Sequence, residues 1–522
     1  MAKTQTKIAK NLQLDVVKIR TEFNGFGILK NIIVISLIAL QFIFLTLSYL
    51  YLFNFFRWLA IFSFIMSLST CIYVLSTNKN GQVKGTWILF LLLCFTFGYI
   101  IYFMSNERFL FKNSRKKYSE LYSKTNEFKS NQLDLSNIKN EIKTDCNYLY
   151  SAGTFPAYKN CNLKYFSSGA TLFDDILEEM QKATDFIFIE YFIVSNGVLL
   201  DRMLQILKEK SKQGVDIRII YDDMGSHGTL KRKTKKQIIK SGIKLHAYNK
   251  LVPVFNIALN FRDHRKIVVI DGKVAFTGGA NLADEYTNEK RMHGYWKDTG
   301  IKLKGLCVDT FTLAFLRQWE FINKKQINYS NLLNKSLNYN NNSIVVPFVD
   351  GLDYTASIGK DAYINLISNA KEKIYIMTPY FIPDDSIIEL LKNKAQSGVD
   401  VCLILPDVAD KKFVYYVTRD NAERLIPFGI KVYTMTHSFV HSKVCLTENA
   451  AIVGSINFDQ RSFYQQFESA VYTNDNQILL DVESDFNNTI KACKQITIKN
   501  QKRNKLKNKL IAGIFRILSP FM

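Results

Sequence analysis

Long uncharged apolar stretches dominate the first hundred residues of the chain. Three of them, at 32–53, 58–76 and 87–104, each approach the ~20 residues that a helix needs to cross a bilayer, and none contains a charged side chain. A cleaved secretory signal has an apolar region of only about 7–15 residues. The pattern therefore predicts an uncleaved membrane anchor with about three spans over residues 31–104, preceded by a basic segment at 1–30.

Basic residues flanking these stretches indicate how the anchor is oriented. Cytoplasmic flanks of membrane spans carry an excess of Lys and Arg. The side that holds Arg57 and the segment after residue 104 carries more of them than the opposite side. We therefore predict a multi-pass protein of the cell membrane with its catalytic part in the cytoplasm. If one stretch is re-entrant, the N-terminus lies on the cytoplasmic side as well.

After residue 145 the pattern changes to short runs of Ile, Val and Phe that alternate with amphipathic helical segments, which is typical of α/β layering. Three blocks of this part recur later in the same order: ATDFIFIEYFI with KEKIYIMTPYFI, KSKQGVDIRIIYDD with NKAQSGVDVCLILPD, and FRDHRKIVVIDGKVAFTGGAN with SFVHSKVCLTENAAIVGSIN. The repeat predicts an α/β fold with two homologous sheet-and-helix domains, at 146–336 and 343–498.

The remaining segments are polar. Residues 105–145 are charged and without sustained periodicity, so we interpret them as a connector between anchor and body. The Asn-rich stretch 338–342 is expected to be a surface loop between the two domains. Residues 499–522 combine a basic run with LIAGIFRIL, a pattern suited to lie on an anionic membrane leaflet or, alternatively, to form a solvated terminal helix.

Composition narrows the classes of protein that fit. The 522 residues are 48% hydrophobic and 13% aromatic with only 8 Pro, which excludes a largely disordered or collagen-like chain. The 68 Lys and Arg against 46 Asp and Glu give a net charge of +22, so the partner is expected to be anionic: nucleic acid, an acidic membrane or a phosphate-bearing substrate. The 8 cysteines form no C-x-x-C pair or Cys/His cluster, and we predict reduced thiols and no metal.

The chemistry-bearing residues lie in the last repeated block. Of the 6 histidines, His264 and His441 occupy matching places in the two copies, and each is followed two positions later by a lysine, Lys266 or Lys443. Residues two apart on a strand face the same side, so each His–Lys pair can reach one pocket. A lone His on a strand is usually structural, but the duplication of the whole pattern favours a functional role.

Each hairpin then returns through small residues to an amide, Asn281 in the first copy and Asn457 in the second. Two imidazoles, two ammonium groups and two amides suit displacement at phosphorus in a diester. One neutral imidazole can attack phosphorus, while the other, protonated, donates to the departing alkoxide. The lysines and amides would stabilise charge on the non-bridging oxygens. This chemistry requires neither a metal nor a cofactor.

These blocks resemble a known family. HRKIVVID at 264–271 with GGAN at 278–281, and HSKVCLTE at 441–448 with GSIN at 454–457, resemble the paired H-x-K-x4-D and G-[GS]-x-N motifs of the phospholipase D superfamily. Within it, NFRDHRK, TPYFIP and FDQRSFYQQFE resemble the bacterial cardiolipin synthases. The resemblance covers most of residues 145–522. It implies two phospholipase D-type domains that form one shared site.

The resemblance also implies a reaction and a set of roles. One phosphatidylglycerol would give its phosphatidyl group to His264 with release of glycerol, and a second would accept it to form cardiolipin, with His441 as acid and base. Phosphatidylglycerol and anionic membrane lipids are the expected partners, and no nucleic acid. The other motif residues are expected to hold the phosphate or, for Glu468, to orient a catalytic histidine: Lys266, Lys443, Asn281, Ser455, Asn457 and Glu468.

The motif carboxylates leave alternatives open. Asp271 lies an odd number of residues after His264 and would face away from it on a regular strand, so a turn or support role stands beside the catalytic one. Glu448 replaces the motif Asp of the second copy. Either the longer side chain compensates for a tighter hairpin, or Glu448 is not the functional equivalent of Asp271.

Several rival functions share the same motifs. The two histidines specify the donor chemistry but not the acceptor, so a phosphatidylserine synthase or a hydrolytic phospholipase D is the nearest alternative. A membrane-bound nuclease of the same superfamily is a further one, disfavoured by the apolar spans. A non-catalytic membrane scaffold is disfavoured because both His–Lys pairs are intact. The oligomeric state is left open.

Overall fold

A computed structural model describes most of the chain after the first membrane-like stretch. The described residues are 36, 39–47, 53–77, 81–104, 112–250, 261–333, 335, 337–351, 357–497, 512, 513, 515 and 516. The chain forms two units. The first unit comprises Met1–Leu110 with Phe255–Ala258, and the second comprises Phe111–Val254 with Leu259–Met522.

Helices make up the described part of the first unit: α2 (Phe53–Ser76), α3 (Gly81–Leu93) and α4 (Gly98–Met104). Among the described residues one helical segment, Arg57–Ser76, is long and apolar enough to cross a membrane, and α3 is shorter. Apolar side chains are exposed along Arg57–Ser76, including Trp58 at 65% and Ile72 at 63%. The predicted third span is divided by a turn at 94–97. The predicted basic segment 1–30 and much of the first span lie outside the described residues.

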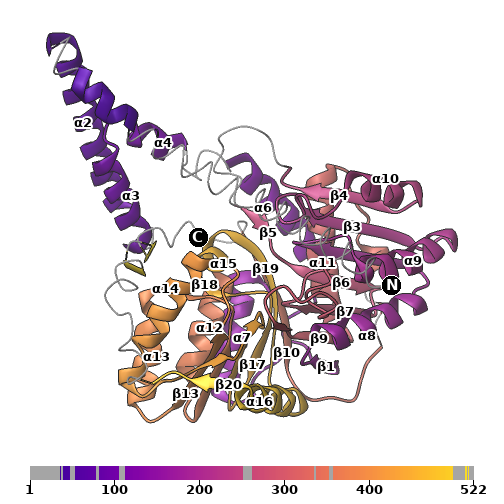
Figure 1. The fold of residues 1–522 in the computed structure, drawn as a ribbon. Helices are drawn as coiled ribbons and strands as arrows, with labels where there is room; N and C mark the ends of the chain where they lie inside the picture. Colours follow the sequence, from indigo (N-terminus) through magenta and orange to yellow (C-terminus); the bar gives the residue numbers. More distant parts are fainter. Residues whose placement is uncertain are drawn as a thin grey trace, which may run out of the picture. The chain divides into compact units, whose positions relative to one another are not determined.

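Two sheets with matching strand order form the second unit (Figure 1). The first sheet runs β1 (Asn162–Phe166), β9 (Gly300–Lys304), β7 (Val274–Gly278), β6 (Lys266–Ile270), β2 (Phe186–Tyr191), β3 (Asp216–Asp222) and β4 (Lys244–Tyr248). The second runs β10 (Val345–Asp350), β19 (Gln466–Thr473), β17 (Ala451–Gly454), β16 (Val444–Thr447), β11 (Lys373–Met377), β13 (Asp400–Pro406), β14 (Lys431–Met435) and β20 (Cys493–Gln495).

Strand directions match as well. In each sheet three neighbouring strands are parallel, β2–β3–β4 and β11–β13–β14, and the hairpins β6–β7 and β16–β17 join them antiparallel. Short parallel ladders connect the halves: β5 (Arg262–Asp263) pairs with β19, and β8 (Tyr295–Lys297) pairs with β15 (Ser438–Val440). In the second half, β12 (Phe381–Ile382) pairs with β18 (Phe458–Asp459).

Helices cover the sheets, and the alternation of β6 shows how. Ile267 and Val269 enter a core that extends through both halves, whereas Val268 and Ile270 enter a second core on the other face of the first sheet. The helices of the first half are α8 (Gly169–Lys182), α9 (Val198–Lys212), α10 (Arg232–Lys240) and α11 (Val308–Asn323). Those of the second are α12 (Ile358–Asn369), α13 (Asp385–Gln396), α14 (Lys412–Glu423), α15 (Gln460–Tyr464) and α16 (Asn476–Lys491).

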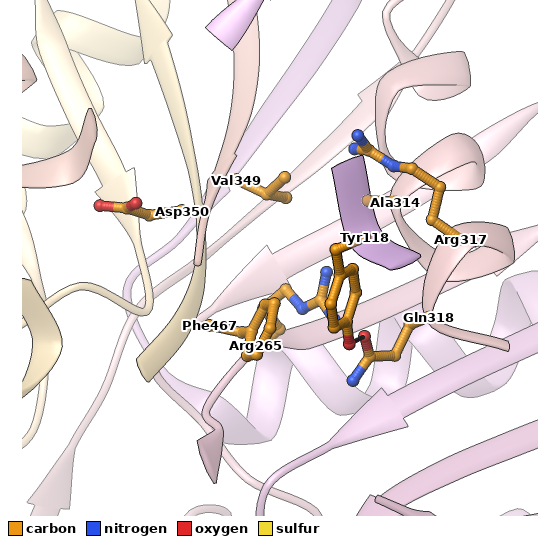
Figure 2. A pocket seen from close by; sticks show the side chains of 8 residues that line it. All are labelled: Tyr118, Arg265, Ala314, Arg317, Gln318, Val349, Asp350 and Phe467. Atoms are coloured by element: carbon orange, nitrogen blue, oxygen red, sulfur yellow. Dashed lines mark hydrogen bonds between the residues drawn. The ribbon is translucent and has the colours of Figure 1, made fainter. Parts of the chain in front are cut away.

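The segment predicted to be a polar connector is partly helical. It contains α6 (Lys112–Asn126) and the start of α7 (Asn140–Gly153). On α6, Tyr118 stacks on Phe321 of α11 with ring centroids 3.9 Å apart, and its hydroxyl donates to Gln318 (Figure 2). A few buried side chains in an otherwise charged stretch were enough to dock this helix, which a search for sustained periodicity does not detect.

The C-terminal segment is described only at four positions. Phe515 contacts Phe413 of α14, with ring centroids 4.3 Å apart. Arg516 forms an ion pair with Asp420 and donates to Asn421 at 2.9 Å. These contacts involve the second half itself. The proposed membrane contact of residues 499–522 stays a prediction.

Asp271 and Glu448 make matching contacts where β6 and β16 end. Asp271 has a positive φ of 54°, and its carboxylate accepts from the backbone amides of Thr184, Asp185 and Phe186 at 2.8–2.9 Å. Glu448 accepts from the amides of residues 371, 372 and 373 at 2.7–3.3 Å. Each carboxylate therefore holds the entry to the neighbouring strand, β2 or β11, and the longer Glu reaches the same kind of target.

We expect Asp271→Ala to destabilise the second unit without removing a reacting group. The substitution leaves three backbone amides without their acceptor, which corresponds to about 1–3 kcal/mol for each such group that stays buried and unsatisfied. Thermal melting of the solubilised protein should shift downward, while turnover per folded molecule stays near that of the wild type. Lost turnover with unchanged melting would instead place Asp271 in the chemistry.

Candidate active site

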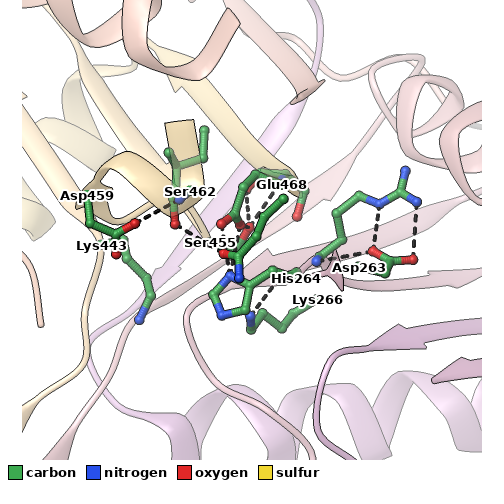
Figure 3. Close-up of polar contacts among 12 residues, drawn as sticks. Asp263, His264, Lys266, Lys443, Ser455, Asp459, Ser462 and Glu468 are labelled. Atoms are coloured by element: carbon green, nitrogen blue, oxygen red, sulfur yellow. Dashed lines mark hydrogen bonds and ion pairs between the residues drawn. The ribbon is translucent and has the colours of Figure 1, made fainter. Parts of the chain in front are cut away.

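The first histidine is set by the ladder between β5 and β19. Asp263 lies opposite Phe467 in that ladder, so the next residues along each strand, His264 and Glu468, come side by side. The amide of His264 donates to the carbonyl of Phe467 at 2.9 Å. Its Nδ1 lies 2.9 and 3.0 Å from the two carboxylate oxygens of Glu468 (Figure 3).

The second histidine is set in the same way by β8 and β15. Lys297 lies opposite Val440, and the amide of His441 donates to the carbonyl of Lys297 at 2.7 Å. The next residue, Asp298, places Oδ2 2.8 Å from Nδ1 of His441. Each imidazole is thus oriented by a carboxylate from the opposite half.

Asp298 was not among the predicted site residues. It lies in the segment GYWKDTGIKL, just before β9. In the first sheet the motif glycine Gly278 pairs with Gly300, and in the second sheet the motif glycine Gly454 pairs with Ala470. Both carboxylates therefore stand two residues before the partner of the motif glycine. This shared position relative to the motif glycine is the signal that identifies Asp298, and it can be seen only after the strands have been paired.

The two blocks meet in space. The hydroxyls of Thr277 and Ser469 lie 2.9 Å apart across the halves. A Cβ on Gly279 would lie 2.9 Å from the carbonyl oxygen of His441 and 2.1 Å from Oδ1 of Asp298, so only glycine fits there. Ser455, the matching residue of the second half, donates through its hydroxyl to Glu468.

Both lysines point back to their histidines. Nζ of Lys266 donates to the carbonyl of His264 at 2.5 Å. Nζ of Lys443 lies 2.8 Å from Nδ1 of His441 and donates to the carbonyl of the same residue. The two lysines are 2% and 0% exposed. Such desolvated cations favour the arrival of an anion.

The asparagines differ in their partners. Asn281 accepts from the amide of Ile193 at 3.2 Å and donates to the hydroxyl of Tyr286 at 2.6 Å. Asn457 is 4% exposed, and its buried Oδ1 has no hydrogen-bond partner. Asn457 is thus the amide whose hydrogen bonding is incomplete.

Aromatic rings surround the imidazoles. Phe192 meets His264 edge to face, with ring centroids 5.1 Å apart. Tyr286, Trp296 and Phe439 approach His441, with centroids at 5.3, 5.5 and 5.9 Å. These rings exclude water from both histidines, which strengthens every charge interaction inside the site.

Burial controls the protonation of the site. Burial lowers the pKa of His264 well below its ordinary 6.5, and Lys266 and Lys443 lower it further. Burial and Lys443 lower the pKa of His441 to about 4, against the effect of Asp298. Burial also lowers the pKa of Lys266 to about 7 and that of Lys443 to about 8. The empty site thus holds neutral imidazoles and lysines that lose their proton readily.

The structure brings most of the predicted residues together, but Asp271 and Glu448 are separate. Their backbone partners lie at the entries of β2 and β11, at the ends of β6 and β16 away from the histidines. Neither carboxylate contacts His264 or His441, whose Nδ1 atoms are held by Glu468 and Asp298.

Comparisons with known proteins agree with this architecture. A family model described as the PLD-like domain of cardiolipin synthase matches residues 176–292 and 363–490, one His–Lys block in each. A cardiolipin synthase of Staphylococcus aureus (strain Mu50) is 31% identical over 463 residues, covering 85% of this chain and 92% of the relative. One of Clostridium perfringens (strain SM101) is 31% identical over 458 residues, covering 85% and 95%.

The chain belongs to the bacterial cardiolipin synthase family. The predicted family resemblance and the α/β phospholipase D-like fold are therefore confirmed. An uncharacterised Streptococcus mutans protein is 38% identical over 377 residues, 72% of this chain and 82% of that protein. The crystal structure of phosphatidylserine synthase from Haemophilus influenzae has a TM-score of 0.55 at 15% identity, covering 73% of this chain and 100% of that one, and shares the fold.

Removing either cross-half carboxylate should impair turnover and leave the fold intact. In Asp298→Asn and Glu468→Gln the amide can no longer accept the Nδ1 proton in the same way, so the imidazole loses its tautomer and orientation, and kcat should fall by about 100-fold or more. The matched control is Asp475→Asn, because Asp475 caps α16 by accepting from Ile478 at 3.1 Å, a role that Asn also fills. Wild-type kcat in both site variants would contradict this assignment.

The alkaline limb of activity should lie unusually low. A lysine binds an anion only while charged, and the pKa of Lys266 is about 7 and that of Lys443 about 8, below the ordinary 10.5. In the free enzyme kcat/KM should therefore fall as pH rises through this range. The pKa of His264 lies well below 6.5, so His264 is already neutral there and does not contribute to this limb. Lys443→Arg, if active, should move the limb upward because Arg stays charged. A profile that is flat to about pH 10 would contradict this reading.

Proposed function

We propose that this member of the family is a cardiolipin synthase that transfers a phosphatidyl group from one phosphatidylglycerol to another and releases glycerol. The observation that carries the proposal is the pair of imidazoles, each held through Nδ1 by a carboxylate from the other half. That arrangement leaves the Nε2 atom of each ring for chemistry, one as nucleophile and one as acid and base.

In the first step, Nε2 of His264 attacks the phosphorus of the donor lipid. The bond between phosphorus and the glycerol head group breaks, and His441 in its protonated form donates to the departing alkoxide. The Nδ1–H of His264 donates to Glu468, which stabilises the positive charge that the ring acquires. The product is glycerol and a phosphatidyl-histidine.

Substrate binding prepares His441 for this donation. Lys443 lies close to its Nδ1 and contributes to its low pKa. A phosphodiester anion bound to Lys266 and Lys443 neutralises those cations, so the pKa of His441 rises and the imidazole takes up a proton. The pKa of His264 rises as well, but burial keeps it well below its ordinary value, so the nucleophile stays neutral. Asp298 stabilises the imidazolium.

In the second step, the head-group hydroxyl of the acceptor attacks phosphorus and His441 takes its proton. The bond from phosphorus to His264 breaks, which releases cardiolipin and restores both rings. Lys266, Lys443 and the Nδ2 group of Asn457 donate to the non-bridging oxygens and stabilise their negative charge in both steps. Asn281 and Ser455 hold the surrounding loop and Glu468 in place.

The setting of the reaction belongs to the proposal. We assign the first unit to a multi-pass anchor in the cell membrane, with the second unit in the cytoplasm and in contact with anionic lipid. The exposed apolar side chains of Arg57–Ser76 support such an anchor. We interpret the two halves as homologous domains that share one site, which the matching strand orders support.

A lipid turnover assay tests the function. Purified full-length protein in detergent with labelled phosphatidylglycerol should release glycerol and form a diphosphatidyl product. His264→Ala and His441→Ala should each abolish turnover, because each removes one imidazole, while both variants still insert in membranes and melt cooperatively. Formation of phosphatidic acid alone would indicate a hydrolase, a serine-dependent product a phosphatidylserine synthase, and DNA cleavage without lipid turnover a nuclease.

A further inference from the structure

A buried polar cluster lies directly behind the first histidine. Arg265 follows His264 in the two-residue link between β5 and β6, and its side chain packs against Asp263 and Phe467. Its guanidinium pairs with Glu190 at 2.7 Å and with Asp263 at 3.1 and 3.3 Å. Arg265 and Asp263 are 3% and 1% exposed, and Glu190 is fully buried.

The cluster continues to the helix that begins the second unit. Gln318 of α11 donates to Asp263 at 3.0 Å and accepts from the hydroxyl of Tyr118 on α6. Phe467, the residue before Glu468, lies between these groups: its ring centroid is 5.4 Å from that of Tyr118 and 5.1 Å from the Arg265 guanidinium (Figure 2).

These contacts bear on catalysis because the ladder that sets His264 is short. β5 pairs with β19 through two residue pairs, Arg262 with Gln466 and Asp263 with Phe467. So short a ladder needs support from side chains to hold an imidazole within the narrow tolerance of a nucleophile. Arg265 supplies that support, since it contacts the side chains of both Asp263 and Phe467.

The cluster also balances its own charge. Burial raises the pKa of Glu190 well above its ordinary value. Burial would raise the pKa of Asp263 as well, but Arg265 holds it below the ordinary value. A protonated Glu190 beside an ionised Asp263 and a charged Arg265 leaves the cluster without net charge.

The second half has different residues in the matching places. Ser442 follows His441 where Arg265 follows His264, and its hydroxyl lies 3.5 Å from the carbonyl of Lys297. Met377 stands where the first half has Glu190, because Glu190 pairs with Ile267 and Met377 pairs with Val444, the residues that directly follow the two motif lysines. The support is therefore specific to one histidine.

We propose that Arg265 is a positioning residue for the His264–Glu468 pair, and that Tyr118 on α6 completes the hydrogen-bond network that fixes it. The inference rests on the proposed function, since it concerns the step that His264 performs. It assigns the helix after the anchor a part in the formation of the phosphatidyl-histidine, when the free ring of His264 must be aimed at phosphorus. It assigns the helix no part in the breakdown, because the bond from phosphorus to His264 then already fixes the ring.

Two Tyr→Phe variants of the same helix test the proposal. Tyr118→Phe removes the hydroxyl that binds Gln318, whereas Tyr122→Phe removes one that donates to the carbonyl of Gly153, outside the cluster. Labelled phosphatidylglycerol is mixed with full-length protein, and the covalent adduct is followed by rapid quenching at neutral pH. In Tyr118→Phe, formation of the adduct should slow by about 10-fold or more, with KM nearly unchanged. Its breakdown by acceptor, and both steps in Tyr122→Phe, should match the wild type.

The outcomes separate the two proposals. A wild-type chain that forms no adduct would defeat the proposed function itself. A reactive wild type in which Tyr118→Phe behaves like Tyr122→Phe, or in which breakdown slows as much as formation, would overturn the positioning role alone. Arg265→Lys is the second variant: it keeps the charge but loses the planar fork, so formation of the adduct should stay slow. Full rates in Arg265→Lys would also overturn the proposal.

Discussion

The candidate active site depends on one arrangement, a histidine from each half held by a carboxylate from the other. Two short parallel ladders, β5 with β19 and β8 with β15, set this exchange residue by residue. A half on its own would have an imidazole without the acceptor for its Nδ1 proton. The matching sheets, the cross-half hydroxyl contact and the glycine required at position 279 all keep the two ladders together.

Dehydration explains the electrostatics of the site. Two lysines, two carboxylates and two imidazoles lie almost out of water, so every charged form depends on its neighbours. Lys266 and Lys443 can be charged because Glu468 and Asp298 are near, while burial first and the same cations second keep both imidazoles neutral. An incoming phosphodiester supplies a negative charge beside the two lysines, so substrate binding is coupled to the protonation of His441.

The sequence predicted the α/β fold, the repeat and the histidine blocks, because duplicated motifs stand out against local variation. Asp298 was missed because the number of residues between Asn281 and Asp298 differs from the number between Asn457 and Glu468. The equivalence of Asp298 and Glu468 therefore appears only in the strand register. The odd spacing of Asp271 from His264 left a support role open, and the backbone contacts of Asp271 and Glu448 favour that role. The docking of α6 depends on a few contacts with residues far along the chain.

The two halves have diverged in ways that distinguish their histidines. Behind His264 stand the buried ion pair of Arg265 with Asp263 and a glutamate that is itself held by Ser455. Behind His441 stand a serine and an aspartate, with a lysine close to Nδ1. A nucleophile must keep a fixed direction through bond formation, whereas an acid and base must change its charge in each step. The rigid support of His264 and the lysine close to Nδ1 of His441 fit this division of labour.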